Sequence, residues 1–442
     1  MDTAIHVITT IKNVLNDPAF QATHRNSETA FTRQRQLTFI RVTVLILQKS
    51  LTSLQLVLNE FFGKLHQTLQ LPQATVTASA LTQARQKLKY TAFCDLITQA
   101  LVAPYDQTPT YRTWRGLRVM AVDGSNIRLP DTPEIRREFG AIGFSNQQEG
   151  VRGASPYGLS VIYDDLLNQR PFASLLTHGT AYEAEVALHL CPSLTPPDLV
   201  LCDRGFPSYR FFATFLAANT PFVGRCSRMS FGEARAMFAD DAPRSRVVTL
   251  SAPPGQKASL LALGLPLSLR LRFVRVVLDS GDVEVLGTSL LDDATFPADV
   301  FEDLYGLRWG VETLYDRVKN RLNLENFSGK TVDAVKQDFY ATIFLSGLES
   351  VLIHDAQHHL DYSASGRQYP QQVTHAVAFN TIKHHVIELF LADHDPLTLF
   401  QELTQLFLTK PVLIRKGRKV DRLKRNATQL VHYDKRLKKI CF

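Results

Sequence analysis

The sequence lacks the features that would mark a membrane or secreted protein. Its 442 residues contain no uncharged apolar run of about 18 residues, the length that a membrane-spanning helix requires. The N-terminus carries Asp2, His6 and Lys12 and does not show the basic-then-apolar pattern of a signal peptide. We therefore expect a soluble cytoplasmic protein with no membrane partner.

Paired cysteines are also missing. Five cysteines stand at positions 94, 191, 202, 226 and 441, and none belongs to a C-x-x-C pair. This scatter favours neither a disulfide framework nor a zinc knuckle. We expect reduced and mostly buried thiols.

The composition is that of an ordinary globular chain, with 45% hydrophobic and 21% charged residues. Because 442 residues exceed one hydrophobic core, two or three packed units are expected. The net charge of +7 favours a polyanionic partner.

Positive charge is concentrated near the C-terminus. Residues 410–442 contain twelve Lys or Arg and two Asp, whereas the rest of the chain has 37 basic and 40 acidic residues. Such a tail is either a solvated surface or a DNA contact, and both interpretations stay open.

The first part of the chain is predicted to be helical. Apolar residues recur at helical spacing through residues 39–65, which indicates a small all-α region over residues 1–110. A predicted helix at 80–89 carries Arg85, Lys87 and Lys89 close together. These cations indicate either a helix–turn–helix-like DNA reader or a basic, solvated helix face.

From about residue 112 short apolar runs alternate with helical stretches, which predicts an α/β fold with a mixed sheet. A β-rich insertion is predicted over 226–298, with a hairpin that turns at 279–282. A long helix follows, with Asp299 and Glu302 as a capping box, and ends near residue 322. A helical C-terminal region then covers 331–442 with the basic tail. The order β-β-β-α-β-α-β is predicted at 117–122, 157–163, 171–176, 182–190, 199–201, 208–218 and 221–224.

Two aspartates follow predicted strands directly. Asp123 ends an apolar strand where Gly124 and Ser125 turn the chain, and Asp203 follows the strand at 199–201. Neighbouring parallel strands bring their C-terminal ends together at one edge of a sheet, where α/β proteins place functional groups. Alone, each could be only a turn residue. The pairs Asp164–Asp165 and Asp292–Asp293 also fall in predicted turns, and we expect them to be solvated.

The long helix adds a third acid. At about 100° per residue, Tyr305, Arg308, Glu312 and Lys319 share one narrow stripe, opposite an apolar stripe. Two aspartates and a glutamate from separate segments suit hard divalent cations, which bind oxygen ligands, so Mg²⁺ is the predicted occupant. Two such ions can activate a nucleophile and stabilise the leaving oxygen of a phosphodiester. Arg308 and Lys319 would bind phosphates.

These segments together resemble the DDE transposases of the insertion-sequence-4 family, whose catalytic core is ribonuclease-H-like. In that family the first Asp stands in Asp-Gly-Ser/Thr, as in residues 123–125, and the second in Asp-Arg-Gly-Phe, as in residues 203–206. The third acid lies on a helix with the pattern Tyr-x2-Arg-x3-Glu-x6-Lys, which Tyr305, Arg308, Glu312 and Lys319 reproduce.

The resemblance implies cleavage at transposon inverted-repeat ends and strand transfer into target DNA. Catalysis and binding of two Mg²⁺ ions, with Mn²⁺ as a substitute, would fall to Asp123, Asp203 and Glu312. Tyr305, Arg308 and Lys319 would hold DNA phosphate, and Trp309 would stack on a displaced base. The resemblance further implies that residues 1–110 bind the transposon end, that residues 111–330 form the catalytic core, and that residues 331–442 support dimerisation or DNA contact. It also implies a homodimer on DNA and a location in the bacterial cytoplasm, at the nucleoid.

Two other functions remain as alternatives. One is a ribonuclease-H-like nuclease or resolvase that cuts DNA without strand transfer. The other is a non-catalytic DNA-binding protein derived from a transposase. Metal-dependent cleavage separates the second alternative from the enzymes, and joined products separate a transposase from a nuclease.

Overall fold

The computed structural model describes residues 2–33, 35–48, 53–72, 74–106, 111–146, 151–363 and 368–414. The chain divides into two compact units. The first comprises Met1–Tyr111, Ile127–Tyr157 and Arg317–Phe442, and the second comprises Arg112–Asn126 and Gly158–Asp316.

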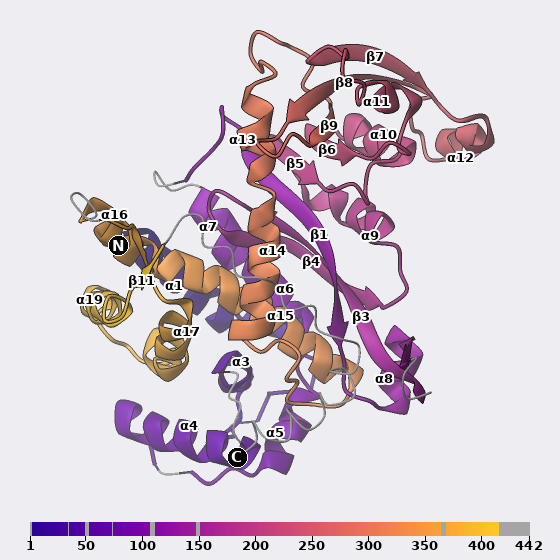
Figure 1. Cartoon of the computed structure of the whole chain (residues 1–442). Helices are drawn as coiled ribbons and strands as arrows, with labels where there is room; N and C mark the ends of the chain where they lie inside the picture. The colour runs from indigo at the N-terminus through magenta and orange to yellow at the C-terminus, as the bar shows by residue number, and fades with distance from the viewer. Residues whose placement is uncertain are drawn as a thin grey trace. The chain divides into compact units, whose positions relative to one another are not determined.

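The second unit is built on a mixed β-sheet (Figure 1). Its strands follow the spatial order β4-β3-β1-β5-β6-β9-β8-β7. Strand β5 pairs in parallel with β1 and with β6, whereas β4, β7, β8 and β9 pair antiparallel with their neighbours. The strands are β1 (Arg118–Arg128), β3 (Val151–Asp165), β4 (Arg170–His178), β5 (Asp198–Cys202), β6 (Phe222–Cys226), β7 (Ser245–Ser251), β8 (Ser268–Val277) and β9 (Val283–Thr288).

The order of elements in this unit agrees with the order predicted from the sequence. Three strands, β1, β3 and β4, are followed by helix α9 (Glu183–Leu190), strand β5, helix α10 (Tyr209–Ala217) and strand β6. The predicted fold class is confirmed in its architecture, a mixed α/β sheet with helical regions before and after it. Helix α8 (Pro133–Phe139) and strand β2 (Ala141–Asn146), which pairs with the start of β3, were not predicted.

The β-rich segment predicted at 226–298 is present, with the hairpin formed by β8 and β9. It also contains α11 (Gly232–Ala236) and α12 (Lys257–Ala262). Strand β9 pairs with β6, and β8 and β7 follow it outward. The insertion therefore continues the same sheet.

Both faces of the central strands are covered, because every residue of β5 is buried. On one face, alternate residues such as Val122 and Cys202 join a core with α9 and α10. Helix α10 contributes Phe211, Phe212 and Phe215 to this core, and the Phe212 ring stacks on Phe222 with centroids 4.4 Å apart. A buried aromatic cluster thus fixes α10 against the sheet.

The long helix predicted from Asp299 is interrupted. It consists of α13 (Val300–Gly306), α14 (Trp309–Asp316) and the π-helical turn η4 (Arg317–Arg321). Leu307 and Arg308 form the break. There the Arg308 amide donates to the Tyr305 carbonyl oxygen over 3.0 Å, which is the i to i−3 hydrogen bond of a 3₁₀ turn and not the i to i−4 bond of an α-helix. The predicted capping box is also wrong, since the Asp299 side chain makes no capping hydrogen bond.

The first unit is largely helical, as predicted for residues 1–105 and 331–409. Its longest helix is α15 (Val332–Leu352), most of whose residues are buried. Its other helical elements are α1 (Asp2–Asn16), α2 (Pro18–His24), α3 (Phe39–Gln48), α4 (Leu54–Leu69), α5 (Ala78–Arg85), α6 (Thr91–Leu96), η1 (Ile97–Val102), α7 (Ala103–Asp106), α8, η4, α16 (His354–Tyr362), α17 (His375–His384), α18 (Val386–Phe390) and α19 (Pro396–Phe407), with the short strands β10 (Gln371–Gln372) and β11 (Val412–Leu413).

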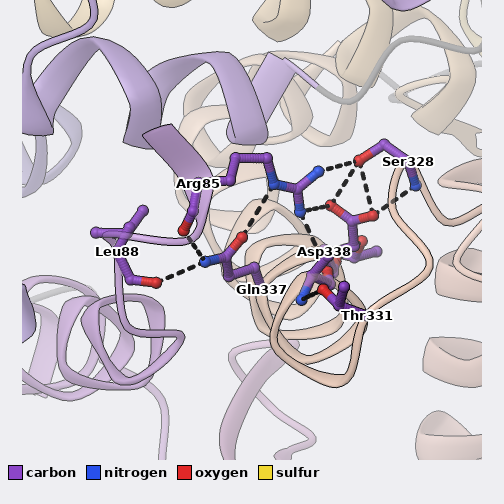
Figure 2. A network of polar contacts seen from close by, with 8 residues as sticks. Arg85, Leu88, Ser328, Thr331, Gln337 and Asp338 are labelled. Atoms are coloured by element: carbon purple, nitrogen blue, oxygen red, sulfur yellow. Dashed lines mark hydrogen bonds and ion pairs between the residues drawn. The ribbon is translucent and has the colours of Figure 1, made fainter. Parts of the chain in front are cut away.

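Arg85 departs from both predictions for residues 80–89, because it is neither solvated nor free to read DNA. It is 7% exposed and lies in a polar network at the start of α15 (Figure 2). Its guanidinium donates to Asp338 over 2.8 Å, to Gln337 over 3.0 Å and to the Ala334 carbonyl over 3.1 Å. A buried arginine needs such partners, so Arg85 anchors α5 to α15.

Two further expectations concern the basic C-terminal tail and the pair Asp164–Asp165. Most of the basic tail, residues 415–442, lies outside the described residues, as does Cys441. Asp164 and Asp165 are buried, not solvated, and Asp165 pairs with Arg170 over 3.2 Å. None of the described helices is long and apolar enough to span a bilayer.

Candidate active site at the strand ends

Parallel pairing places Asp123 beside Asp203. Strands β1 and β5 are in register from Arg118 opposite Asp198 to Val122 opposite Cys202, so each aspartate directly follows the last matched pair. A buried ion pair, Arg118 Nη2 to Asp198 Oδ2 at 2.8 Å, joins the first matched pair. The sheet hydrogen bonds and this ion pair together set the relative position of the two carboxylates.

Asp203 is neutralised by an arginine from the next strand. Arg225 on β6 places Nε 3.0 Å from Asp203 Oδ1, and it also pairs with Glu284 on β9. The Tyr305 hydroxyl on α13 donates to the same Asp203 oxygen over 3.3 Å. Burial, followed by the charge of Asp203, raises the pKa of Tyr305 well above its ordinary value, so it stays a donor.

Glu312 is held by Arg308, which lies in the break between α13 and α14. Arg308 Nη2 is 3.0 Å from Glu312 Oε1. The Arg308 side chain is 2% exposed, and its Nε has no hydrogen-bond partner among the described residues. Its guanidinium lies 4.5 Å from the Trp309 ring centroid, and that ring is itself 54% exposed. A buried cation with an unused donor beside an accessible aromatic ring is suited to an anionic ligand.

Asp123 is the acid whose environment is least favourable for charge. Its pKa is raised to about 6, chiefly by burial and also by the charges of Glu183 and Glu312, while the Gly124 amide and Arg308 act in the opposite direction. The Gly124 amide donates to Asp123 Oδ1 over 3.0 Å. The Tyr315 hydroxyl lies within hydrogen-bond distance of two backbone carbonyl oxygens, that of Ser160 at 2.8 Å and that of Asp123 at 3.2 Å.

Glu183, the first residue of α9, is an acid that the sequence analysis missed. A Cβ atom at Gly124 would lie 2.5 Å from Glu183 Cδ, so the glutamate fills the space beside Asp123 that the glycine leaves. Burial raises the pKa of Glu183. An acid in the first turn of a helix is common, and only the glycine after Asp123 hints at a close neighbour.

The seven residues singled out in the sequence fall into three groups. Asp123, Asp203, Glu312, Tyr305 and Arg308 are connected by hydrogen bonds, ion pairs and mutual electrostatic effects within the second unit. Trp309 adjoins them through Arg308. Lys319 lies in η4, which belongs to the first unit. Arg225, Glu284 and Glu183 complete the set and were not predicted.

The donor atoms of this site suit a hard divalent cation. Asp123, Glu183, Asp203 and Glu312 offer only carboxylate oxygens, the ligands that Mg²⁺ and Mn²⁺ prefer. Counting Glu284, which also pairs with Arg225, the set holds five acids and two arginines, so negative charge is in excess. Within the described ranges no three His, Cys, Asp or Glu side chains are grouped as a metal site. The chemistry of the residues therefore fits a metal, while in this structure arginines balance two of the acids.

A comparison with known families decides the assignment. Residues 114–348 match the family model described as the transposase DDE domain, and this match covers more than half of the chain. The chain belongs to the DDE transposase family. The matched segment contains the three candidate acids of the DDE site, Asp123, Asp203 and Glu312.

One relative within this family is a transposase of an insertion sequence 4 element. The chain is 26% identical, over 278 residues, to the transposase InsG for insertion sequence element IS4 of Escherichia coli (strain K12). The alignment covers 62% of this chain, and the chain thus spans about 60% of the length of that relative. A cryo-EM structure of the piggyBac transposase synaptic complex with hairpin DNA is 12% identical, with a TM-score of 0.42, covering 99% of this chain and 85% of that chain. A similarity this low does not bear on the fold.

Proposed function

We propose that this DDE transposase cleaves DNA at the inverted-repeat ends of a transposon and joins the resulting 3′-hydroxyl to target DNA. Transposon-end DNA and target DNA are then its substrates. The observation that supports this function best is the convergence of Asp123 and Asp203, at paired strand ends, with Glu312. Arg308 interacts electrostatically with all three acids, and a cluster of titratable groups of this kind is typical of a functional site.

Asp123, Asp203 and Glu312 are the proposed ligands of two Mg²⁺ ions, for which Mn²⁺ can substitute. When bound, such ions supply Lewis-acid activation of the attacking oxygen and stabilisation of the leaving oxygen of a phosphodiester. The acids would hold these ions between the neighbouring strand ends, at one edge of the sheet. Charge balance by Arg225 and Arg308 would keep the site assembled before the substrate arrives.

Arg308 is the proposed phosphate clamp. Its Nε is buried and unpaired among the described residues, and its Nη2 donates to Glu312 over 3.0 Å. A phosphate oxygen would supply the missing acceptor, and the guanidinium fork would orient it. Tyr305 would donate from the adjoining turn, Lys319 would add a second cation, and Trp309 would stack on a displaced base.

The regions outside the DDE domain carry proposals from the resemblance alone. Residues 1–110 would bind the transposon end, and residues 331–442 would support dimerisation and further DNA contact. The active form would be a homodimer on DNA, working in the bacterial cytoplasm at the nucleoid.

The decisive experiment measures cleavage and joining of a duplex that carries the candidate inverted repeat, with Mg²⁺ or Mn²⁺. Wild type is compared with Asp203→Asn and with Asp240→Asn, a control that removes one exposed carboxylate of the same unit. We expect metal-dependent nicking and joined products from wild type and the control, and a loss of both in Asp203→Asn.

The two alternatives give different outcomes in the same assay. Metal-dependent cleavage with no joined product would identify a nuclease or resolvase. Tight binding of the duplex with no cleavage by any variant would identify a non-catalytic DNA-binding protein. Equal cleavage by wild type and Asp203→Asn would overturn the proposed role of Asp203.

A further inference from the structure

A second concentration of unbalanced charge lies in the first unit. A cavity of about 640 Å³ opens between the loop at residues 27–37 and the segment at residues 75–87. Three cations line it, namely Arg33, Arg35 and Lys87, and all three are exposed. No carboxylate is among the lining residues.

These cations differ from others in the same unit. Arg85 and Lys64 each have a carboxylate partner, Asp338 and Glu388 respectively. In contrast, Arg33, Arg35 and Lys87 form no ion pair with any residue that the structure describes. Three uncompensated positive charges in a concave site focus their field on an anion in the solvent.

The remainder of the lining is able to hydrogen-bond to an anion. Hydroxyls and amides predominate, supplied by Ser27, Thr29, Thr32, Gln36, Thr75 and Gln83. Neutral donors of these types, together with Arg and Lys, make most of the contacts to DNA phosphates and sugars. The polar part of the lining is therefore that of a backbone-binding surface, and the rest is apolar, supplied by Ala30, Phe31, Leu37, Val76, Ala80 and Ala84.

Both walls of the cavity are fixed by the packing around them. On the loop side, Phe31 has a φ of 60°, a strained conformation for an aromatic residue, and its ring packs edge-on against Phe39 at 5.6 Å. On the helix side, Arg85 anchors α5 to Asp338, Gln337 and Ser328 (Figure 2). Ala80, Gln83 and Ala84 of the same helix line the cavity. Pre-formed walls lower the entropic cost of binding.

We infer that this cavity binds the phosphodiester backbone of duplex DNA, with Arg33, Arg35 and Lys87 as phosphate ligands. The inference rests on the proposed function in one respect, because that function is the reason for choosing DNA as the polyanion. It assigns a binding surface to the N-terminal part of the chain and a role to residues that no catalytic step uses. Because phosphate contacts carry no sequence information, the surface contributes affinity and position, not recognition of the repeat.

The test measures binding of a fluorescent duplex by anisotropy in EDTA, so that no cleavage takes place. The triple variant Arg33→Gln/Arg35→Gln/Lys87→Gln is compared with wild type over a series of salt concentrations. The matched control, Arg246→Gln/Lys257→Gln/Arg270→Gln, removes the same charge from exposed positions of the second unit.

We expect the triple variant to raise Kd by on the order of 10-fold to 100-fold at 100 mM salt and to flatten the salt dependence by roughly one per lost contact. The control should change Kd by less than about 3-fold. The loss should be equal on a repeat-containing duplex and on a scrambled duplex. Circular dichroism and Tm establish that each variant is folded.

Three results would overturn the inference. The first is a folded triple variant whose Kd and salt dependence equal those of wild type. The second is a control variant that loses as much affinity as the triple variant. The third is a triple variant that loses affinity for single-stranded RNA and not for duplex DNA. Failure of the wider proposal looks different, because then wild type itself would bind no duplex in this assay.

Discussion

The two units each bury a cluster of charged groups, and the clusters differ in how completely their members are bonded. In the first unit, Arg85 reaches three side chains and a carbonyl, and Asp338 also accepts from the Ser328 amide over 2.6 Å. In the second, Arg308 is at least as buried, yet its Nε is unpaired among the described residues and its bonded partner Glu312 is partly exposed.

This difference separates a structural role from a functional one. A buried charge with all its partners in place stabilises the fold, and it has nothing left to offer a ligand. A buried charge with an unused donor costs free energy until a ligand arrives. We therefore interpret the Arg85 cluster as an anchor and the Arg308 cluster as a site prepared for an anion, and the following variants test that contrast.

Arg85→Met should give the largest loss of stability. It would leave the buried Asp338 without its cation, which costs about 3–5 kcal/mol. Chemical unfolding measures this loss. The double variant Arg85→Met/Asp338→Leu should recover much of it, because neither charge then remains buried. A loss below about 1 kcal/mol in the single variant would contradict the anchor role.

Arg308→Met should show the opposite pattern, with activity lost and stability kept. Removing one preorganised contact to a developing charge lowers the rate about 100-fold to 1,000-fold. The free energy of unfolding should change by less than about 1 kcal/mol, because Glu312 is partly exposed and regains water. Cleavage rate and chemical unfolding are measured on the same preparation. A variant that unfolds like Arg85→Met and cleaves like wild type would reverse our assignment of the two clusters.

The pH dependence of stability should reveal the cost of burying the charged form of Asp123. Its pKa is raised from an ordinary 3.8 to about 6, chiefly by burial, so between these pH values the folded chain holds a proton that the unfolded chain has released. The contribution of Asp123 to stability must then fall as the pH rises through that window, by up to about 3 kcal/mol. Unfolding of Asp123→Asn in EDTA should lack this decline, and Asp240→Asn should retain it.

Gly124→Ala should have the smallest effect. Its Cβ would lie 2.5 Å from Glu183 Cδ, so the glutamate must move away, at a cost of about 1 kcal/mol. Gly205→Ala is the matched control beside the second aspartate, where a Cβ meets no atom within 4 Å. Adding Glu183→Ala to Gly124→Ala should restore the lost stability. If Gly205→Ala is equally costly, crowding by Glu183 is not the reason.

The sequence allowed the sheet and its two strand-end acids to be predicted because both depend on local patterns. Apolar runs located β1 and β5, and Asp123 and Asp203 follow those runs directly. The parallel register that sets them side by side is a property of the folded sheet. The expectation that the two acids meet therefore came from the general topology of α/β folds, in which parallel strands end at the same edge, and not from the local sequence.

The partners of the acids could not be predicted, because they come from segments distant in sequence. Arg225 and Glu284 are 59 positions apart and meet only when β6 pairs with β9. Arg85 and Asp338 are 253 positions apart, so the sequence around Arg85 gave no sign of its partner and predicted an exposed cation. The break at Leu307 and Arg308 did have a local signal, since Gly306 and Gly310 stand on either side of it.

The continuation of the sheet through β9, β8 and β7 has a consequence for how this chain can be divided. A segment inserted between two parts of a domain is often treated as a cassette that can be excised or exchanged. Here its last strand covers the edge of β6, and Glu284 on that strand holds the arginine that neutralises Asp203. Excision would leave an unpaired strand edge exposed to self-association and would release Arg225. The insertion is thus not a removable module, and any shortened form of this protein must keep the final strand of the insertion.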